Sequence, residues 1–491
     1  MLELLYGATL VLLAAYGINS LLLTAIYWLR PRRAEPALKL SSPAVFPMVS
    51  VQLPIFNERC VVERLLAAVS ALDYPRNRLQ VQVVDDSTDE TREMVDRIAA
   101  RMRARGIQVE VCRRPQATGH KGGALAAAMP GARGEFIAIF DADFLPRSDF
   151  LLRTLPSFSD PRIGCVQTRW EHVNAGYSLF TQVQAAGIDG HFIVEQEARN
   201  RMGWFIGFNG SAGVWRKTCI ESAGGWKGDT LTEDLDLSYR AQLAGWRFAF
   251  RSEVTVPGEV PAQMDAYKRQ QFRWAKGSVQ CAKKLLPELW RARLPLAVKI
   301  QGTLHLGGYL MHPLMLLAFL LGVPMAVAHS SVFSWLPYLA VAMLGPWWLY
   351  GTALAQRPRT LGNWLTSMLM LNLLGAGMSI NNTRAALEAL LGIDSVFRRT
   401  PKFDLRSRAD QWRANQYALP NDPIVWAELA AAVLAFAALL FSVSGHGARV
   451  NQWLLIYGAG YGYVALLSLW QGYARDAVRR AAARREITIS D

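Results

Sequence analysis

Residues 136–143 read FIAIFDAD, an apolar run that ends in two aspartates separated by one alanine. The β-branched and aromatic residues of the run favour a buried strand, which would place Asp141 and Asp143 at its carboxyl end. Carboxylates without partners are almost never fully buried, so a role in the core does not explain them. Two carboxylates in this arrangement can hold Mg²⁺ or Mn²⁺, which prefer oxygen ligands. The stretch predicts a sheet edge that binds a cation, although a pattern this short also occurs by chance.

The alternation of strand-like and helical patterns around this run indicates the fold class. Apolar runs of strand length are separated by helical periodicities, which predicts an α/β fold with a parallel sheet covered by helices. Sheets of this kind bind ligands at the carboxyl ends of their strands. Asp85 and Asp86 end the second strand, where they would either face a ligand or cap the next helix. The expected strands cover 48–53, 79–84, 109–112 and 136–140, and the expected helices cover 58–70, 90–105 and 121–129.

Six apolar runs place the chain in a membrane, since each is near the roughly 20 residues that a helix needs to cross a bilayer. The first run has Glu3 before it and Arg30 after it, the reverse of a signal peptide, so we expect an anchor with a cytosolic basic end. The five cysteines are scattered without metal-ligand spacing, which fits a reduced compartment. We expect a multi-pass protein of a bacterial inner membrane with a cytosolic domain. The runs cover 4–29, 303–328, 332–355, 361–380, 424–441 and 453–473.

The formal net charge of +14 does not indicate nucleic acid, because the arginine clusters flank the apolar runs and no nucleic-acid motif is present. Basic residues in such places set topology and contact anionic lipid. If Arg30 is cytosolic and every run crosses, the clusters at 398–408 and 475–485 both lie outside the cytosol. Both lie in the cytosol if the run at 361–380, which Gly375 and Gly377 interrupt, is an interfacial or re-entrant helix. We therefore expect five crossings.

Three further motifs follow in the segment between the first two apolar runs. Lys121 lies in GHKGGAL at 119–125 and would be a mobile charge beside a phosphate, or else a solvated surface lysine. The TED triplet at 232–234 could supply a general base or simply begin a helix. The QQFRW motif at 270–274 offers an arginine for a diphosphate and a tryptophan face for a sugar, or it marks a membrane-interface helix.

Taken together, these motifs resemble those of processive family 2 glycosyltransferases. The resemblance covers about 51–404, and it is nearest to plant cellulose-synthase-like glucomannan and glucan synthases and their bacterial relatives, with bacterial cellulose synthase more distant. The order and spacing of the blocks match the family, although they do not specify the sugar. The matching blocks are DDSTD at 85–89, GHKGGAL at 119–125, IFDADF at 139–144, VQTRW at 166–170, GFNGSAG at 207–213, TED at 232–234 and QQFRW at 270–274.

The resemblance implies a GT-A, Rossmann-like catalytic domain inserted into a multi-pass α-helical membrane domain. It implies Asp234 as the general base that deprotonates the acceptor hydroxyl, and Asp141 and Asp143 as ligands of Mg²⁺ or Mn²⁺. The implied donor-binding residues are Asp85, Asp86, Lys121, Asp141, Gln270 and Arg273, and the implied acceptor-binding residues are Phe208, Asn209, Gly210, Glu233 and Trp274.

The segment at 397–402 reads FRRTPK and falls where relatives carry a gating segment over the donor pocket. It departs from the FxVTxK pattern of cellulose synthase, and a basic juxtamembrane loop is the alternative to the gating role. The expected organisation is an N-terminal membrane helix at 1–30, the catalytic domain at 31–275, an amphipathic interface helix at 276–300, membrane helices with one interfacial helix at 301–395, a gating loop at 396–423, two membrane helices at 424–474 and a basic cytosolic tail at 475–491.

The resemblance implies a polysaccharide synthase that transfers hexosyl units to a growing β-linked glycan, and it leaves GDP-mannose, GDP-glucose and UDP-glucose open as donors. Inversion is implied by the family, and coupled translocation through the chain's own helices is the further expectation. Transfer of one sugar to a lipid acceptor, such as ceramide or polyprenyl phosphate, is the alternative. An inactive scaffold or transport subunit is disfavoured because all four of Lys121, Asp141, Asp143 and Asp234 are present. The expected partners are the donor, the glycan and membrane lipid.

Overall fold

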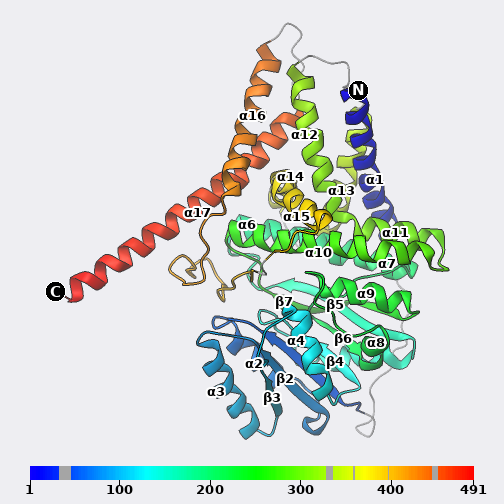
Figure 1. Cartoon of the computed structure of the whole chain (residues 1–491), viewed down its shortest axis with the longest axis vertical. Helices are drawn as coiled ribbons and strands as arrows, with labels where there is room; N and C mark the ends of the chain where they lie inside the picture. The colour runs from blue at the N-terminus through cyan, green and yellow to red at the C-terminus, as the bar shows by residue number, and fades with distance from the viewer. Residues whose placement is uncertain (32–45, 328–335, 358–359, 396–397, 445–451, 491) are drawn as a thin grey trace.

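The computed structural model describes residues 1–31, 46–327, 336–357, 360–395, 398–444 and 452–490. An α/β domain lies at one end, a layer of transverse helices covers it, and a bundle of apolar helices rises beyond that layer (Figure 1). Arg32, Arg33, Phe397 and the start of the apolar run predicted at 332–355 lie outside the described residues.

A seven-stranded sheet with the order β3-β2-β1-β4-β6-β5-β7 forms the centre of the domain. Strands β1 to β4 run parallel to one another. Strand β6 is antiparallel to its neighbours β4 and β5, and β5 runs parallel to β7. The predicted parallel sheet is therefore confirmed for its N-terminal half, whereas the whole sheet is mixed. The strands are β1 (Val49–Ile55), β2 (Leu79–Asp85), β3 (Gln108–Cys112), β4 (Phe136–Ile139), β5 (Ile163–His172), β6 (Gly213–Arg216) and β7 (Arg247–Gly258).

Helices cover both faces of the sheet, because each presents an apolar side to the strands. Val62, Leu65, Leu66 and Val69 of α2 are all buried in the main core cluster. The three predicted helices are confirmed, but the first begins four residues later than expected, at Val62 rather than at 58. The helices of the domain are α2 (Val62–Ser70), α3 (Thr91–Ala104), α4 (His120–Ala128), α5 (Phe150–Thr154), α8 (Lys217–Ser222) and α9 (Glu233–Leu243).

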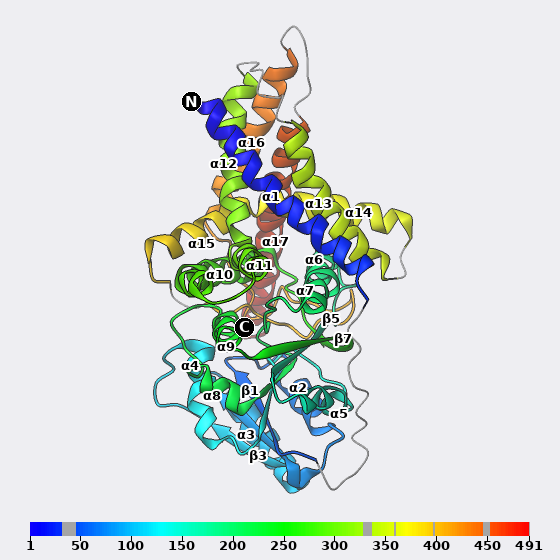
Figure 2. The same cartoon turned by 90° about the vertical axis from the view of Figure 1, so that its right-hand side faces the viewer.

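The transverse layer separates the sheet from the apolar helices (Figures 1 and 2). Its longest helix, α10, runs from Met264 to Arg291, and α11 follows from Leu296. The prediction of one helix at 276–300 is thus wrong in its bounds. The 270–274 motif lies on α10, which ends at Arg291, and a separate helix, α11, begins after Pro295. The layer consists of α6 (Leu179–Asp189), the π-helix η5 (Gly190–Gln196), α7 (Glu197–Met202), α10 (Met264–Arg291), α11 (Leu296–Leu306), α14 (Leu361–Gly377) and α15 (Ser379–Leu391).

The apolar run predicted at 361–380 forms two helices, α14 and α15, with a break at Met378. In Figure 2 they extend to opposite sides, across the direction of α12. Neither is among the four helices that are long and apolar enough to cross a bilayer in the described part of the chain. That the run does not cross stays a prediction.

By length and composition, four helices of the described residues could each cross a membrane: Leu2–Leu29, Gly308–Val327, Ile424–Ser442 and Trp453–Ala482. The bundle packs closely, since a Cβ added at Gly345 of α13 would lie 2.0 Å from the carbonyl oxygen of Gly17 on α1. The tail predicted at 475–491 continues the last helix to Ser490 instead of forming a separate segment. The helices of the bundle are α1 (Leu2–Leu29), α12 (Met311–Val327), α13 (Leu336–Ala355), α16 (Ile424–Ser444) and α17 (Gln452–Ser490).

Candidate active site

One cavity, here called the central cavity, opens between the carboxyl ends of the parallel strands, the first turn of α9, the middle of α10 and residues 399–402. Most of the polar residues predicted for the site lie in this cavity, because the carboxyl ends of parallel strands lie together at one edge of the sheet. Its lining includes Asp86, Lys121, Asp141, Asp143, Asn209, Gly210, Glu233, Asp234, Gln270, Arg273, Trp274, Arg399, Thr400 and Lys402.

Asp141 lies just beyond β4, where the chain leaves the sheet. Its backbone N–H donates to Oγ of Ser211 at 2.9 Å, which fixes the turn. Its Oδ1 accepts a hydrogen bond from Nζ of Lys121 at 2.5 Å, and the same Nζ donates to the carbonyl oxygen of Gly210 at 2.8 Å. Burial alone would lower the pKa of Lys121, but Asp141 and Glu233 raise it, so the lysine stays charged.

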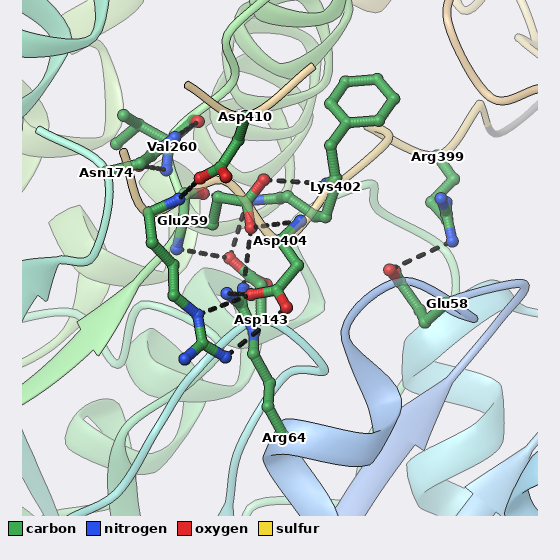
Figure 3. A network of polar contacts seen from close by, with 12 residues as sticks. Glu58, Arg64, Asp143, Asn174, Glu259, Val260, Arg399, Lys402, Asp404 and Asp410 are labelled. Atoms are coloured by element: carbon green, nitrogen blue, oxygen red, sulfur yellow. Dashed lines mark hydrogen bonds and ion pairs between the residues drawn. The ribbon is translucent and has the colours of Figure 1, made fainter. Parts of the chain in front are cut away.

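Asp143 does not face an open cation site in this structure. Its Oδ2 accepts hydrogen bonds from Nζ of Lys402 at 2.7 Å and from the backbone N–H of Glu259 at 3.1 Å (Figure 3). Burial would raise the pKa of Asp143, but Lys402 outweighs it and holds that pKa below its ordinary value. The described residues contain no group of three His, Cys, Asp or Glu side chains that could hold a metal. Asp141 and Asp143 still fit a cation that takes its remaining ligands from a diphosphate.

Residues 399–404, here called the strap, cross the cavity and are fixed at several points (Figure 3). Arg399 forms a 3.1 Å ion pair with Glu58, which follows β1. The backbone N–H groups of Phe403 and Asp404 donate to the two carboxylate oxygens of Glu259 at 2.8 and 3.1 Å. Arg64 of α2 pairs with Glu259 at 2.8 Å and with Asp404 at 2.5 Å.

Asp234 lies in the first turn of α9, beside Lys121 and the 207–213 loop. Gly210 has φ +82°, and a Cβ added there would lie 2.9 Å from Oδ2 of Asp234, so only glycine admits the carboxylate. Burial raises the pKa of Asp234 to about 6, against the lowering effect of Lys121. Burial and the charge of Asp234 likewise raise the pKa of Glu233. A carboxylate with a raised pKa is a better proton acceptor, which suits a general base.

Gln270, Arg273 and Trp274 lie on one face of α10, because positions i, i+3 and i+4 of a helix are neighbours. An Nη2 hydrogen of Arg273 is donated to Oγ1 of Thr400 at 3.1 Å, which connects the helix to the strap. The ring of Trp274 lies 6.5 Å from that of Trp170 on β5, centroid to centroid. The lining of the cavity therefore includes two aromatic rings, Trp170 and Trp274, as well as the charged side chains described above.

Two predicted site residues do not reach the cavity. Asp85 is 2% exposed, and its carboxylate accepts hydrogen bonds from the backbone N–H of Ser87 and from Arg113, each at 3.0 Å. Its neighbour Asp86 does line the cavity, paired with Arg114. Phe208 is 1% exposed and packs edge-on against Trp215, at 5.5 Å between ring centroids. Both residues are buried next to residues that line the cavity, but they do not line it themselves.

The residues that hold the strap were not identified from the sequence. Glu58, Arg64 and Glu259 belong to no short motif, and an isolated charged residue gives no signal of its partner. Arg399 and Lys402 lay in the segment considered for gating, yet their carboxylate partners could not be inferred.

Residues 47–277 match the family model described as "Glycosyltransferase like family 2". Glucomannan 4-beta-mannosyltransferase 1 of Oryza sativa subsp. japonica is 43% identical over 253 residues, which is 50% of this chain and 49% of that protein. Glucomannan 4-beta-mannosyltransferase 9 of Arabidopsis thaliana is 40% identical over 251 residues, 50% of this chain and 47% of that protein. The chain spans about half the length of these relatives.

Among solved structures, a mannosyltransferase from Pyrobaculum calidifontis in complex with GDP-Man and Mn²⁺ matches with a TM-score of 0.56 and 23% identity. The match covers 80% of this chain and 100% of that one. At this identity the likeness establishes the fold, which confirms the predicted GT-A-like α/β arrangement.

Proposed function

We propose that this chain, whose residues 47–277 form a glycosyltransferase family 2 domain, transfers hexosyl units from a nucleotide sugar to the end of a β-linked glycan. The observation that carries the proposal is the position of Asp234: its carboxylate adjoins Gly210, whose carbonyl oxygen accepts from Lys121, the lysine that also holds Asp141. A base and the cationic group for a leaving diphosphate thus share one cavity.

In the proposed reaction, a carboxylate oxygen of Asp234 removes the proton of the acceptor hydroxyl. At the same time the oxygen of that hydroxyl bonds to the anomeric carbon of the donor. The bond between this carbon and the phosphate oxygen breaks on the opposite face, and the nucleoside diphosphate leaves with both electrons. Lys121 and Arg273 neutralise the diphosphate. A bound Mg²⁺ or Mn²⁺, held by Asp141 and Asp143, would add Lewis-acid stabilisation of the same group.

The donor we propose is GDP-mannose. The relatives with about 40% identity are named glucomannan 4-beta-mannosyltransferases, and the matching solved structure was obtained with GDP-Man. We further propose that the catalytic domain faces the cytosol and that the product crosses the membrane through the apolar helices. Polar side chains within those helices support this path, because such groups are costly in lipid. They include Tyr309, whose OH donates to Oε1 of Gln271 at 3.1 Å.

The test uses the purified full chain in detergent with GDP-mannose, GDP-glucose and UDP-glucose in parallel, followed by linkage analysis. We expect a β-linked polymer that contains mannose from GDP-mannose. Products of one or two sugars attached to lipid would instead establish a lipid glycosyltransferase. Absence of transfer from all three donors, with intact folding, would contradict the proposal.

A further inference from the structure

The π-helix η5 carries a polar network that the proposed reaction does not yet use. It spans Gly190–Gln196 between α6 and α7, in the transverse layer. π-helical turns are rare and occur frequently at functional sites. A Cβ added at Gly190 would lie 2.5 Å from the ring of Tyr350 on α13, so an apolar helix packs directly on this turn.

The network begins at Asn209, the neighbour of Gly210 in the central cavity. Nε2 of Gln196 donates to Oδ1 of Asn209 at 2.9 Å and to the carbonyl oxygen of Gly207 at 2.7 Å. This fixes which end of the Asn209 amide is oxygen. Its Nδ2 then faces Nε2 of His191 at 3.1 Å, and because an amide nitrogen only donates, the histidine nitrogen accepts.

The tautomer of His191 follows from this contact. With Nε2 as acceptor, the ring proton lies on Nδ1 and is donated to Oε2 of Glu195 at 3.0 Å. Nη1 of Arg199 reaches the same oxygen at 3.5 Å. Burial would raise the pKa of Glu195, but His191 and Arg199 outweigh it and lower that pKa to about 2. Glu195 is therefore a fixed carboxylate.

The network is open on one side. The side chains of His191 and Glu195 are 26% and 28% exposed, whereas that of Arg199 is 3% exposed. In the part of the chain that the structure describes, the other oxygen of Glu195, Oε1, has no hydrogen-bond partner. One hydrogen of the Asn209 amide is likewise left for the cavity. One oxygen of Glu195 and one amide hydrogen of Asn209 are therefore without a hydrogen-bond partner among the described residues, and Asn209 lines the central cavity.

We propose that Glu195 accepts a hydrogen bond from the second sugar of the acceptor, and that His191 is a positioning residue that joins it to Asn209 at the terminal sugar. This inference rests on the proposed function and names a subsite of the same site. A sugar suits the place, because its hydroxyls can donate to a carboxylate that would be costly beside a lipid chain. Gly190, the first residue of η5, packs against the ring of Tyr350 on α13, which places this part of the network beside the apolar helices.

The experiment compares Glu195→Ala with the unaltered protein, using acceptors of one and of several sugars: a methyl mannoside, and β-1,4-linked mannobiose and mannotriose. Expected is a rise in KM on the order of tenfold for the two longer acceptors and no change for the single sugar. Loss of one charged hydrogen bond is of this size. His191→Phe should raise KM for all three, since the Asn209 amide loses the partner that orients it.

GDP affinity and donor hydrolysis without acceptor are measured on the same variants and should stay unchanged, which would show that the catalytic domain is folded. Glu110→Gln, an exposed residue of β3 in an ion pair with Arg133, is the matched control. An equal penalty of Glu195→Ala for one and two sugars, or a parallel loss of GDP affinity, would overturn the inference. An unaltered protein that neither binds GDP nor transfers sugar would refute the proposed function itself, a distinguishable result.

Discussion

Nζ of Lys402 lies 2.7 Å from Oδ2 of Asp143, so an ammonium group of the strap occupies one of the two carboxylates expected to bind a cation. The same Nζ donates to the carbonyl oxygen of Glu259, and the lysine is 8% exposed. Two cations cannot share one carboxylate oxygen without repulsion. A metal ion bound by Asp143 would therefore compete with the strap.

We predict that Lys402→Met raises the affinity for Mn²⁺ in the absence of donor by about tenfold, equivalent to ~1.4 kcal/mol. The measurement is electron paramagnetic resonance of free Mn²⁺ during titration. Lys283→Met is the control, because among the described residues the only hydrogen bond of this exposed lysine of α10 is to the carbonyl oxygen of Leu390. Unchanged or weaker Mn²⁺ binding by the Lys402 variant would show that no competition exists.

Asp234→Asn should reduce sugar transfer by about 10²–10⁴-fold, the usual loss on removing a general base. Donor affinity, measured by calorimetry, should stay within a few-fold of normal, since we propose that Lys121 and Arg273 bind the diphosphate. The matched control is Asp229→Asn in the preceding loop, which removes an exposed ion pair with Lys284. Near-normal elongation by Asp234→Asn would remove this residue from the mechanism.

The transfer rate should fall as pH drops through about 6. Burial raises the pKa of Asp234 to about 6 from an ordinary 3.8, so the base is ionised above that pH and protonated below it. The measurement is initial rate against pH at saturating donor, with GDP binding followed in parallel to separate lost catalysis from lost affinity. A rate that holds constant down to pH about 4 would contradict a buried carboxylate base.

Asp141→Ala should abolish the metal-dependent part of donor binding. Asp141 is the carboxylate in contact with Lys121, so its loss removes a cation ligand and also frees the lysine. We expect GDP to bind the variant equally with and without Mn²⁺, whereas the unaltered protein binds it more tightly with Mn²⁺. Full activity of the unaltered protein in excess chelator would show that no divalent cation takes part.

The membrane arrangement is tested by labelling with an impermeant thiol reagent in intact cells. Ser407→Cys lies beside the strap and should not react, whereas Val327→Cys, at the end of α12 far from the sheet in Figure 1, should react from outside. The background lacks Cys60 and Cys112, the two partly exposed native cysteines. External labelling at position 407 would place the central cavity outside the cytosol.

The sequence by itself determined the elements and most of the site. Apolar runs of strand length and helical periodicity predicted β1 to β4 and the helices between them, because strands buried on both faces form short continuous apolar runs and helices repeat about every 3.6 residues. Residues that end parallel strands converge at one edge, so Asp86, Asp141 and Asp143 could be placed together. The regular spacing of Gln270, Arg273 and Trp274 likewise put them on one helical face.

Only the tertiary structure decided which neighbouring residue faces the cavity and which partner neutralises it. Asp85 and Asp86 are adjacent, yet one is buried against Arg113 and the other lines the cavity, because successive positions at a strand end point in opposite directions. Phe208 is likewise buried, whereas the adjacent Asn209 lines the cavity. Lys402 reaches Asp143 across 259 positions of the chain, and His191 reaches Asn209 from a π-helix with no sequence signature. Contacts of this kind arise when packed elements bring distant side chains together, which no local pattern encodes.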